Sequence, residues 1–160
     1  MQTKLNTFTP LIFLFFLFVN FTGLYLGGLF TTKAVMAEWY LNLNKSPITP
    51  PGWFFGFAWT TIMVFLAFYM AKAHGTVQNK NKLYVLYGLQ WILNLLWNPV
   101  FFYMQNVTLG LVVILSLTLT VAYILVRYRK SMKWYSLLIL PYVSWLCVAS
   151  YLNLYILLNN

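Results

Sequence analysis

Residues 83–126 read LYVLYGLQWILNLLWNPVFFYMQNVTLGLVVILSLTLTVAYILV and carry no charged side chain. A helix needs about 20 residues to cross roughly 30 Å of hydrocarbon. At about 1.5 Å of helix per residue, this stretch is long enough for two crossings. Gln105 and Asn106 form a polar break near its middle, where the chain can turn. The stretch therefore predicts two membrane helices, near residues 83–103 and 108–126.

Three further uncharged intervals are each long enough for one crossing. They lie between Lys4 and Lys33, between Lys45 and Lys72, and after Lys133. The remaining helices are expected near residues 10–30, 51–71 and 135–157. We therefore predict an all-α membrane protein, a bundle of five transmembrane helices that forms a single domain over residues 1–160.

The composition agrees with a membrane protein and excludes most enzyme classes. Apolar residues make up 62% of the chain and charged residues 7%, whereas about a quarter of a soluble domain is charged. Glu38 is the single acid, Cys147 the single cysteine and His74 the single histidine. A carboxylate pair, an Asp-supported triad, a Cys/His metal cluster and an internal disulfide are therefore all impossible. We expect neither a metal site nor a cofactor.

Ten basic residues against one acid give a net charge of +9. In a soluble protein this charge would suggest a nucleic-acid partner. Here the basic residues lie between apolar runs, so we interpret them as signals of membrane topology. We expect no nucleic-acid partner. With five crossings, one side of the membrane carries Lys4, Lys72, Lys80, Lys82, Arg127, Arg129, Lys130 and Lys133, and the other carries Lys33 and Lys45. The positive-inside rule then predicts a cytoplasmic N-terminus and an external C-terminus in a bacterial inner membrane.

The first connection, residues 31–50, is much longer than the other three. Long loops in compact domains are usually functional or disordered. This one contains Trp39 and Tyr40 together with Glu38, and its aromatic residues argue against disorder. We interpret the loop as a lid over one end of the bundle.

The predicted second helix begins at a proline pair, because proline is tolerated in the first helical turn. Gly56 lies three residues before Trp59 and so shares a helix face with it. The glycine leaves space beside the indole for a flat ligand or for another helix. Ordinary helix packing through a small residue is the more common explanation of such a pair.

On the predicted third helix, Trp91, Asn94, Asn98 and Phe101 follow helical spacings and share one face. Amides at membrane depth usually point into the bundle or a cavity. They indicate either a ligand site or hydrogen bonds that hold neighbouring helices together. Pro99 cannot donate a backbone hydrogen bond, which is expected to free the carbonyl of the residue four before it.

The fifth helix repeats this pattern. Pro141 is expected to free the carbonyl of Leu137, and Trp145 and Ala149 stand one turn apart, a large ring beside a small side chain. In the first helix, Gly23 and Gly27 form a GxxxG pair that permits close helix contact. The sequence leaves open whether that contact is within the chain or with a second subunit.

Three blocks of this sequence resemble the signatures of one family. They are PPGWFFGFAW at 50–59, NLLWNPVFF at 94–102 and PYVSWLCVASYLN at 141–153. Together with the long first loop they resemble the translocator protein family, also called the tryptophan-rich sensory protein (TspO/MBR) or peripheral benzodiazepine receptor family. The resemblance covers nearly the whole chain.

The resemblance implies a five-helix bundle, usually a homodimer, with a pocket under the first loop. That pocket binds protoporphyrin-type tetrapyrroles and isoquinoline or benzodiazepine compounds in the family. Carried over position by position, its lining would be Tyr40, Pro50, Trp59, Asn98, Phe101, Trp145 and Ala149. Trp59 and Trp145 also resemble the paired tryptophans that bacterial relatives use in light- and oxygen-dependent porphyrin breakdown.

The sequence departs from the family in two places. The cholesterol-recognition stretch of animal members needs a tyrosine followed by a basic residue, but here Leu154 and Leu158 stand at those positions and no Lys or Arg follows Lys133. Cholesterol is therefore a doubtful ligand. The small-xxx-small pattern of the third helix is incomplete, because Ile92 follows Gly88 by four residues, which weakens the case for a dimer through that face.

Three functions remain open. We favour a tetrapyrrole-binding membrane protein with a sensing or transport role. The alternative is a catalyst of light-dependent porphyrin degradation in which Trp59 and Trp145 supply electrons or quench radicals. An ion-coupled exporter ranks last, because such transporters need an ionisable residue within the membrane, and Glu38 is expected in a loop and His74 near a helix end.

Overall fold

The structure, a computed structural model, describes residues 9–160. Lys4, which the topology count includes, lies outside this range. The helices are α1 (Pro10–Ala34), α2 (Glu38–Asn42), α3 (Gly52–Thr76), α4 (Lys80–Asn98), α5 (Val107–Met132) and α6 (Leu140–Asn159), with a π-helix η1 (Pro99–Tyr103) and a 3-10 helix η2 (Lys133–Ile139). All regular secondary structure of the described residues is helical, and these residues form no strand. The prediction of an all-α fold is thus confirmed.

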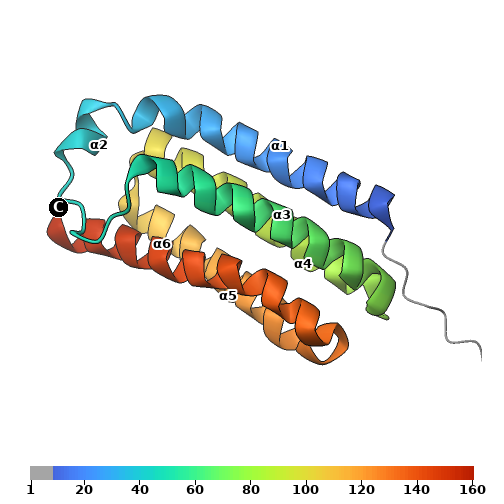
Figure 1. The fold of residues 1–160 in the computed structure, drawn as a ribbon. Helices are drawn as coiled ribbons and strands as arrows, with labels where there is room; N and C mark the ends of the chain where they lie inside the picture. The colour runs from blue at the N-terminus through green and yellow to red at the C-terminus, as the bar shows by residue number, and fades with distance from the viewer. Residues whose placement is uncertain (1–8) are drawn as a thin grey trace, which may run out of the picture.

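Four segments of the described chain are long and apolar enough to cross a membrane. They are Pro10–Ala34, Gly52–Thr76, Lys80–Tyr103 and Val107–Asn159. The last spans 53 residues and includes α5, η2 and α6. Figure 1 shows that α5 and α6 run side by side in opposite directions, joined by a reversal at η2.

Asparagine side chains cap the starts of α4 and α5. Asn106 caps α5 by accepting a hydrogen bond from the Leu109 amide at 2.9 Å, and Asn79 caps α4 through the Lys82 amide at 2.9 Å. Gln105 has a positive φ of 52°, which reverses the chain just before α5. The predicted turn at Gln105 and Asn106 is therefore confirmed.

The two interior prolines behave differently from each other. At Pro99 the α-helix ends and the chain continues as the wider π-helix η1, so the ladder does open there. The expectation for Pro141 is wrong. Residues 133–139 form η2, Pro141 lies in the first turn of α6, and the Leu137 carbonyl accepts from the Leu140 amide. Pro141 starts a helix because its missing N–H is not needed there.

The core lies where α3, α5 and α6 meet, and large side chains such as Tyr69, Leu117 and Leu146 are fully buried there. Many apolar side chains on the outer surface are exposed, as expected for contact with lipid. Side-chain amides connect the helices inside the bundle. Asn20 of α1 donates to the Met63 carbonyl of α3 at 2.9 Å and accepts from the Tyr87 hydroxyl of α4 at 2.7 Å.

The GxxxG pair of α1 faces α4 within the same chain. A Cβ at Gly23 would lie 2.7 Å from Nε1 of Trp91, and one at Gly27 would lie 2.7 Å from Nδ2 of Asn98. The Trp91 indole uses the close approach to donate to the Val19 carbonyl at 3.0 Å. The two glycines therefore bring α1 and α4 together.

Candidate functional site

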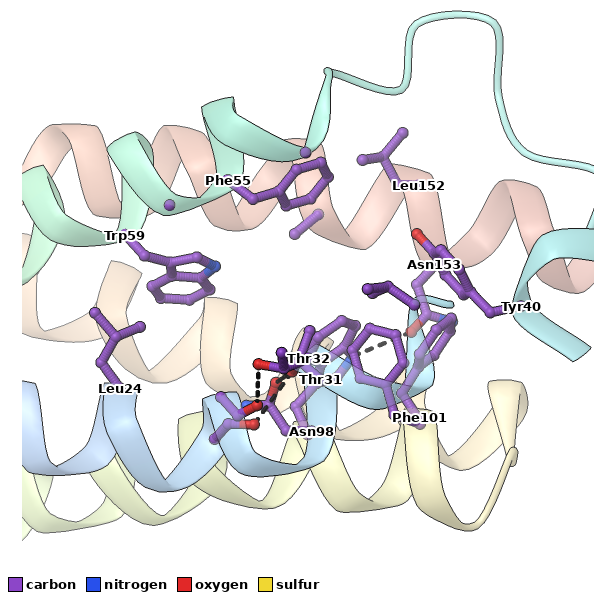
Figure 2. A pocket seen from close by; sticks show the side chains of 18 of the residues that line it. Leu24, Thr31, Thr32, Tyr40, Phe55, Trp59, Asn98, Phe101, Leu152 and Asn153 are labelled. Carbon is purple, nitrogen blue, oxygen red and sulfur yellow. Dashed lines mark hydrogen bonds between the residues drawn. The ribbon is translucent and has the colours of Figure 1, made fainter. Parts of the chain in front are cut away.

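A cavity of about 630 Å³ opens inside the bundle near the end that carries α2. Helices α1, α3, α4 and α6 supply its walls, and α2 and the loop after it supply one end. Figure 2 shows Phe55 and Trp59 on one side and Thr31, Asn98 and Phe101 on the other. Most of the lining is apolar or aromatic, with a small number of hydroxyl and amide groups. Sites for small organic ligands have this character and this range of volumes.

Six of the seven residues expected to line a pocket are brought together around this cavity. They are Tyr40, Pro50, Trp59, Asn98, Phe101 and Ala149. Gly56 also lines it, and no atom outside its own helix lies within 4 Å of the position its Cβ would take. The space that the sequence places beside Trp59 is thus open to the cavity and is not filled by another helix.

Trp145 is the exception. It is 7% exposed and packs against Phe54 and Phe55 of α3, with ring centroids 5.7 and 5.3 Å away. Its Nε1 is buried without a hydrogen-bond partner within residues 9–160. The ring of Phe55 lines the cavity in its place. Trp59 therefore lines the cavity, whereas Trp145 does not.

The amide of Asn98 is fixed at the cavity wall. Its Oδ1 accepts from the Thr31 hydroxyl of α1 at 2.8 Å, and its Nδ2 donates to the Asn94 carbonyl at 3.3 Å. The hydrogen bond between Asn98 and Thr31 lies at the surface of the cavity (Figure 2). The amide therefore joins two helices, as one of the two interpretations of the third helix expects, and it also presents polar atoms to the cavity.

Aromatic rings from η1 and α2 close the end of the cavity. Trp97 stacks on Phe101 with ring centroids 5.0 Å apart and an interplanar angle of 17°, and Tyr40 packs against Phe102 at 5.6 Å. The Trp97 indole donates to Asn153 of α6 at 3.1 Å, and that amide donates to the Val107 carbonyl at 2.9 Å. These contacts hold the rings of the end wall in place.

Several lining residues were missed by the sequence reasoning: Thr31, Lys45, Phe55, Trp97, Phe102 and Asn153. Trp97, Phe102 and Asn153 lie within the blocks that carry the family resemblance, and Phe55 lies between the prolines and Trp59. The three blocks thus contain four of these six lining residues. Nothing local marks Thr31 or Lys45.

The start of the loop between α2 and α3 is fastened both to α2 and to α6. The Lys45 ammonium donates to the carbonyls of Tyr40, Leu41 and Leu43 at 2.5, 3.3 and 3.4 Å, so it caps the end of α2. Asn44 is bound to the end of α6, since its amide N–H donates to Asn160 Oδ1 at 2.8 Å and its side chain donates to the Asn159 carbonyl at 2.9 Å. The loop is therefore tied to α6 beside the cavity.

Tyr40 is the aromatic residue of α2 that lines the cavity. Burial raises the pKa of its phenol above the ordinary value. The group therefore stays protonated at neutral pH and can donate a hydrogen bond.

The comparisons with known proteins agree with this architecture. The profile of the TspO/MBR family matches residues 15–158. The chain belongs to the TspO/MBR family. It is 38% identical over 138 residues to the tryptophan-rich protein TspO of Chlorobaculum tepidum, which covers 84% of this chain and 86% of that protein.

Two further TspO/MBR relatives show the range of the similarity. The chain is 34% identical over 129 residues to the tryptophan-rich sensory protein of Cereibacter sphaeroides, covering 79% of this chain and 81% of that one. It is 28% identical over 134 residues to the translocator protein of Ovis aries, covering 79% of each. The resemblance in the three sequence blocks is thereby confirmed, and the chain is a membrane protein of a sensory and translocator family.

Proposed function

We propose that this protein is a membrane receptor or translocator that binds flat tetrapyrroles of the protoporphyrin type, in a sensing or transport role. Isoquinoline and benzodiazepine compounds are expected to occupy the same site. The observation that carries the proposal is the cavity of about 630 Å³, lined by Trp59, Phe55 and Phe101 among others. Its volume lies within the range of about 300–1,000 Å³ that is usual for ligand pockets.

The lining suits a planar apolar ligand with a polar edge. Burying apolar faces against rings contributes about 25 cal/mol per Å², and aromatic rings stack favourably on one another. Trp59 and Phe55 stand on one side of the cavity and Phe101 on the other (Figure 2). Asn98, held by Thr31, supplies the polar atoms that would orient an edge of the ligand.

We further propose five membrane crossings within one domain of residues 1–160, formed by α1, α3, α4 with η1, α5, and α6. The loop 35–51 then serves as the lid, which its bonds to α6 support. Homodimerisation remains part of the proposal, through a face other than Gly23 and Gly27. Basic residues gather at the end away from α2, which favours a cytoplasmic N-terminus and an external C-terminus in an inner membrane.

A titration of protoporphyrin IX into the full-length protein in detergent micelles tests the proposal. The Soret absorbance of the porphyrin reports binding. We expect saturable binding, weakened at least tenfold in Trp59→Leu, because this variant removes one stacking face. Trp134→Leu is the matched control, since Trp134 is 82% exposed at the opposite end of the bundle. Absence of saturable binding at micromolar porphyrin contradicts the proposal, and so does an equal loss in both variants.

A further inference from the structure

Basic side chains gather at the end of the bundle opposite α2. The turn between α3 and α4 and the reversal between α5 and α6 meet there (Figure 1). The cations at this end are Lys72, Lys80, Lys82, Arg127, Arg129, Lys130 and Lys133. We call this set the basic end. Apart from the half-buried Lys72, all of its members are exposed.

No acidic side chain can neutralise the basic end. Glu38 is the single acid of the whole sequence, and it lies in α2 at the other end of the bundle. Like charges held this close repel one another, and the repulsion is relieved by anions from the surroundings. The basic end therefore requires counterions that the chain does not supply.

The cations stand at the edge of an aromatic zone. The Lys82 ammonium of α4 lies 5.5 Å from the centroid of the Tyr123 ring of α5, and Arg127 follows Tyr123 by one helical turn. The Lys72 ammonium lies 4.7 Å from the centroid of the Tyr135 ring. Lys82 and Arg127 thus reach the same tyrosine from two different helices.

Two further exposed aromatic residues belong to this end of the bundle, Trp134 next to Lys133 in the chain and Tyr135 beside Lys72. Trp134 is 82% exposed and Tyr135 is 48% exposed. Tryptophan and tyrosine are enriched at the level of the lipid headgroups, where long basic side chains also extend toward the polar region. Cations beside such rings are typical of the depth at which lipid phosphates lie.

We propose that the basic end binds the headgroups of anionic phospholipids. The phosphate of such a lipid meets Lys82 and Arg127 together, and its acyl chains pack beside the ring of Tyr123, which is 44% exposed. Each basic residue near an anionic membrane surface contributes about 1 kcal/mol, or roughly a fivefold change in affinity. A soluble anion would use the cations and leave the exposed rings uncovered, which is why the geometry favours a lipid.

Thermal unfolding of the full-length protein in mixed micelles tests this inference. The lipid is added as phosphatidylglycerol or as zwitterionic phosphatidylcholine, and inorganic phosphate is added in a separate series. We expect phosphatidylglycerol alone to raise the unfolding midpoint, with an effect that falls in high salt. In the double variant Lys82→Gln/Arg127→Gln, the concentration for half-maximal stabilisation should rise by roughly 25-fold.

Two further variants make the result decisive. Arg129→Gln/Lys130→Gln removes another pair from the basic end and should weaken the lipid effect similarly. Lys33→Gln removes an exposed cation from the opposite end and should leave it unchanged. Equal stabilisation by the two lipids overturns the inference. An equal effect of inorganic phosphate, or an undiminished response in both double variants, overturns it too.

Discussion

Substitution of Gly56 by leucine should block the cavity without unfolding the protein. Gly56 lines the cavity, and a side chain built there enters open space. A leucine that fills this space denies the ligand an equivalent area of contact, worth about 2 kcal/mol. The expected result is a roughly 30-fold weaker affinity for protoporphyrin IX. Replacing a helical glycine also favours the helix by up to about 1 kcal/mol, so the unfolding midpoint should not fall.

Gly88→Leu is the matched control for this experiment. Gly88 is also a helical glycine with no atom outside its own helix within 4 Å of a Cβ, but it does not line the cavity. Its neighbours Val85 and Ile92 are exposed on the outer face of α4. Porphyrin binding is measured from the Soret band and stability from thermal unfolding. If both variants bind porphyrin as tightly as the parent protein does, the ligand does not occupy this cavity.

Two other predictions concern the loop and the contact between α1 and α4. Asn160→Ala removes two hydrogen bonds to Asn44, so amide exchange of residues 43–50 should quicken by about fivefold per lost bond, whereas Asn81→Ala at the opposite end should not change it. Unchanged exchange would show that the bonds to α6 do not hold the loop. Gly27→Ala places a methyl group 2.7 Å from Asn98 Nδ2 and should cost about 1–3 kcal/mol in thermal unfolding, whereas Gly28→Ala enters open space and should be neutral or stabilising. Equal midpoints for the two variants would mean that α1 and α4 adjust freely at this contact.

The membrane helices were predictable because charge and length constrain them strongly. Uncharged intervals that can cross hydrocarbon are few, and both the proline pair before α3 and the polar break at Gln105 mark helix ends. The start of α6 was not predictable from these intervals. Residues 134–139 are uncharged like the helix that follows, and the choice of a 3-10 helix depends on how they pack against α3 and α5.

The cavity lining was predictable to the extent that helical spacing determines it. Trp59, Asn98 and Ala149 occupy inward faces that spacing and the family resemblance both indicate. Trp145 shares a face with Ala149, yet Phe55 of a different helix stands between its ring and the cavity. Packing between α3 and α6 decides which of the two rings covers the other. No sequence pattern within either helix predicts this arrangement.

Hydrogen bonds between residues far apart in the sequence could not be predicted either. Asn44 and Asn160 lie 116 residues apart and meet because α6 ends beside the loop. Local patterns describe which residues share a helix face, whereas such a pair depends on how whole helices are placed.

The distribution of charge separates the two proposed binding regions by mechanism. Lys45 is the charged residue among those lining the cavity, and its ammonium is already bound by three carbonyls at the end of α2. A ligand carboxylate that recruited Lys45 would have to replace those bonds, which hold the loop. Affinity in the cavity must therefore come mainly from apolar burial and aromatic contact.

At the basic end, affinity must instead come mainly from charge, because the single acid of the sequence, Glu38, lies at the other end of the bundle. The protein thus uses shape and apolar surface at one end and charge at the other, and its net charge says little about what enters the cavity.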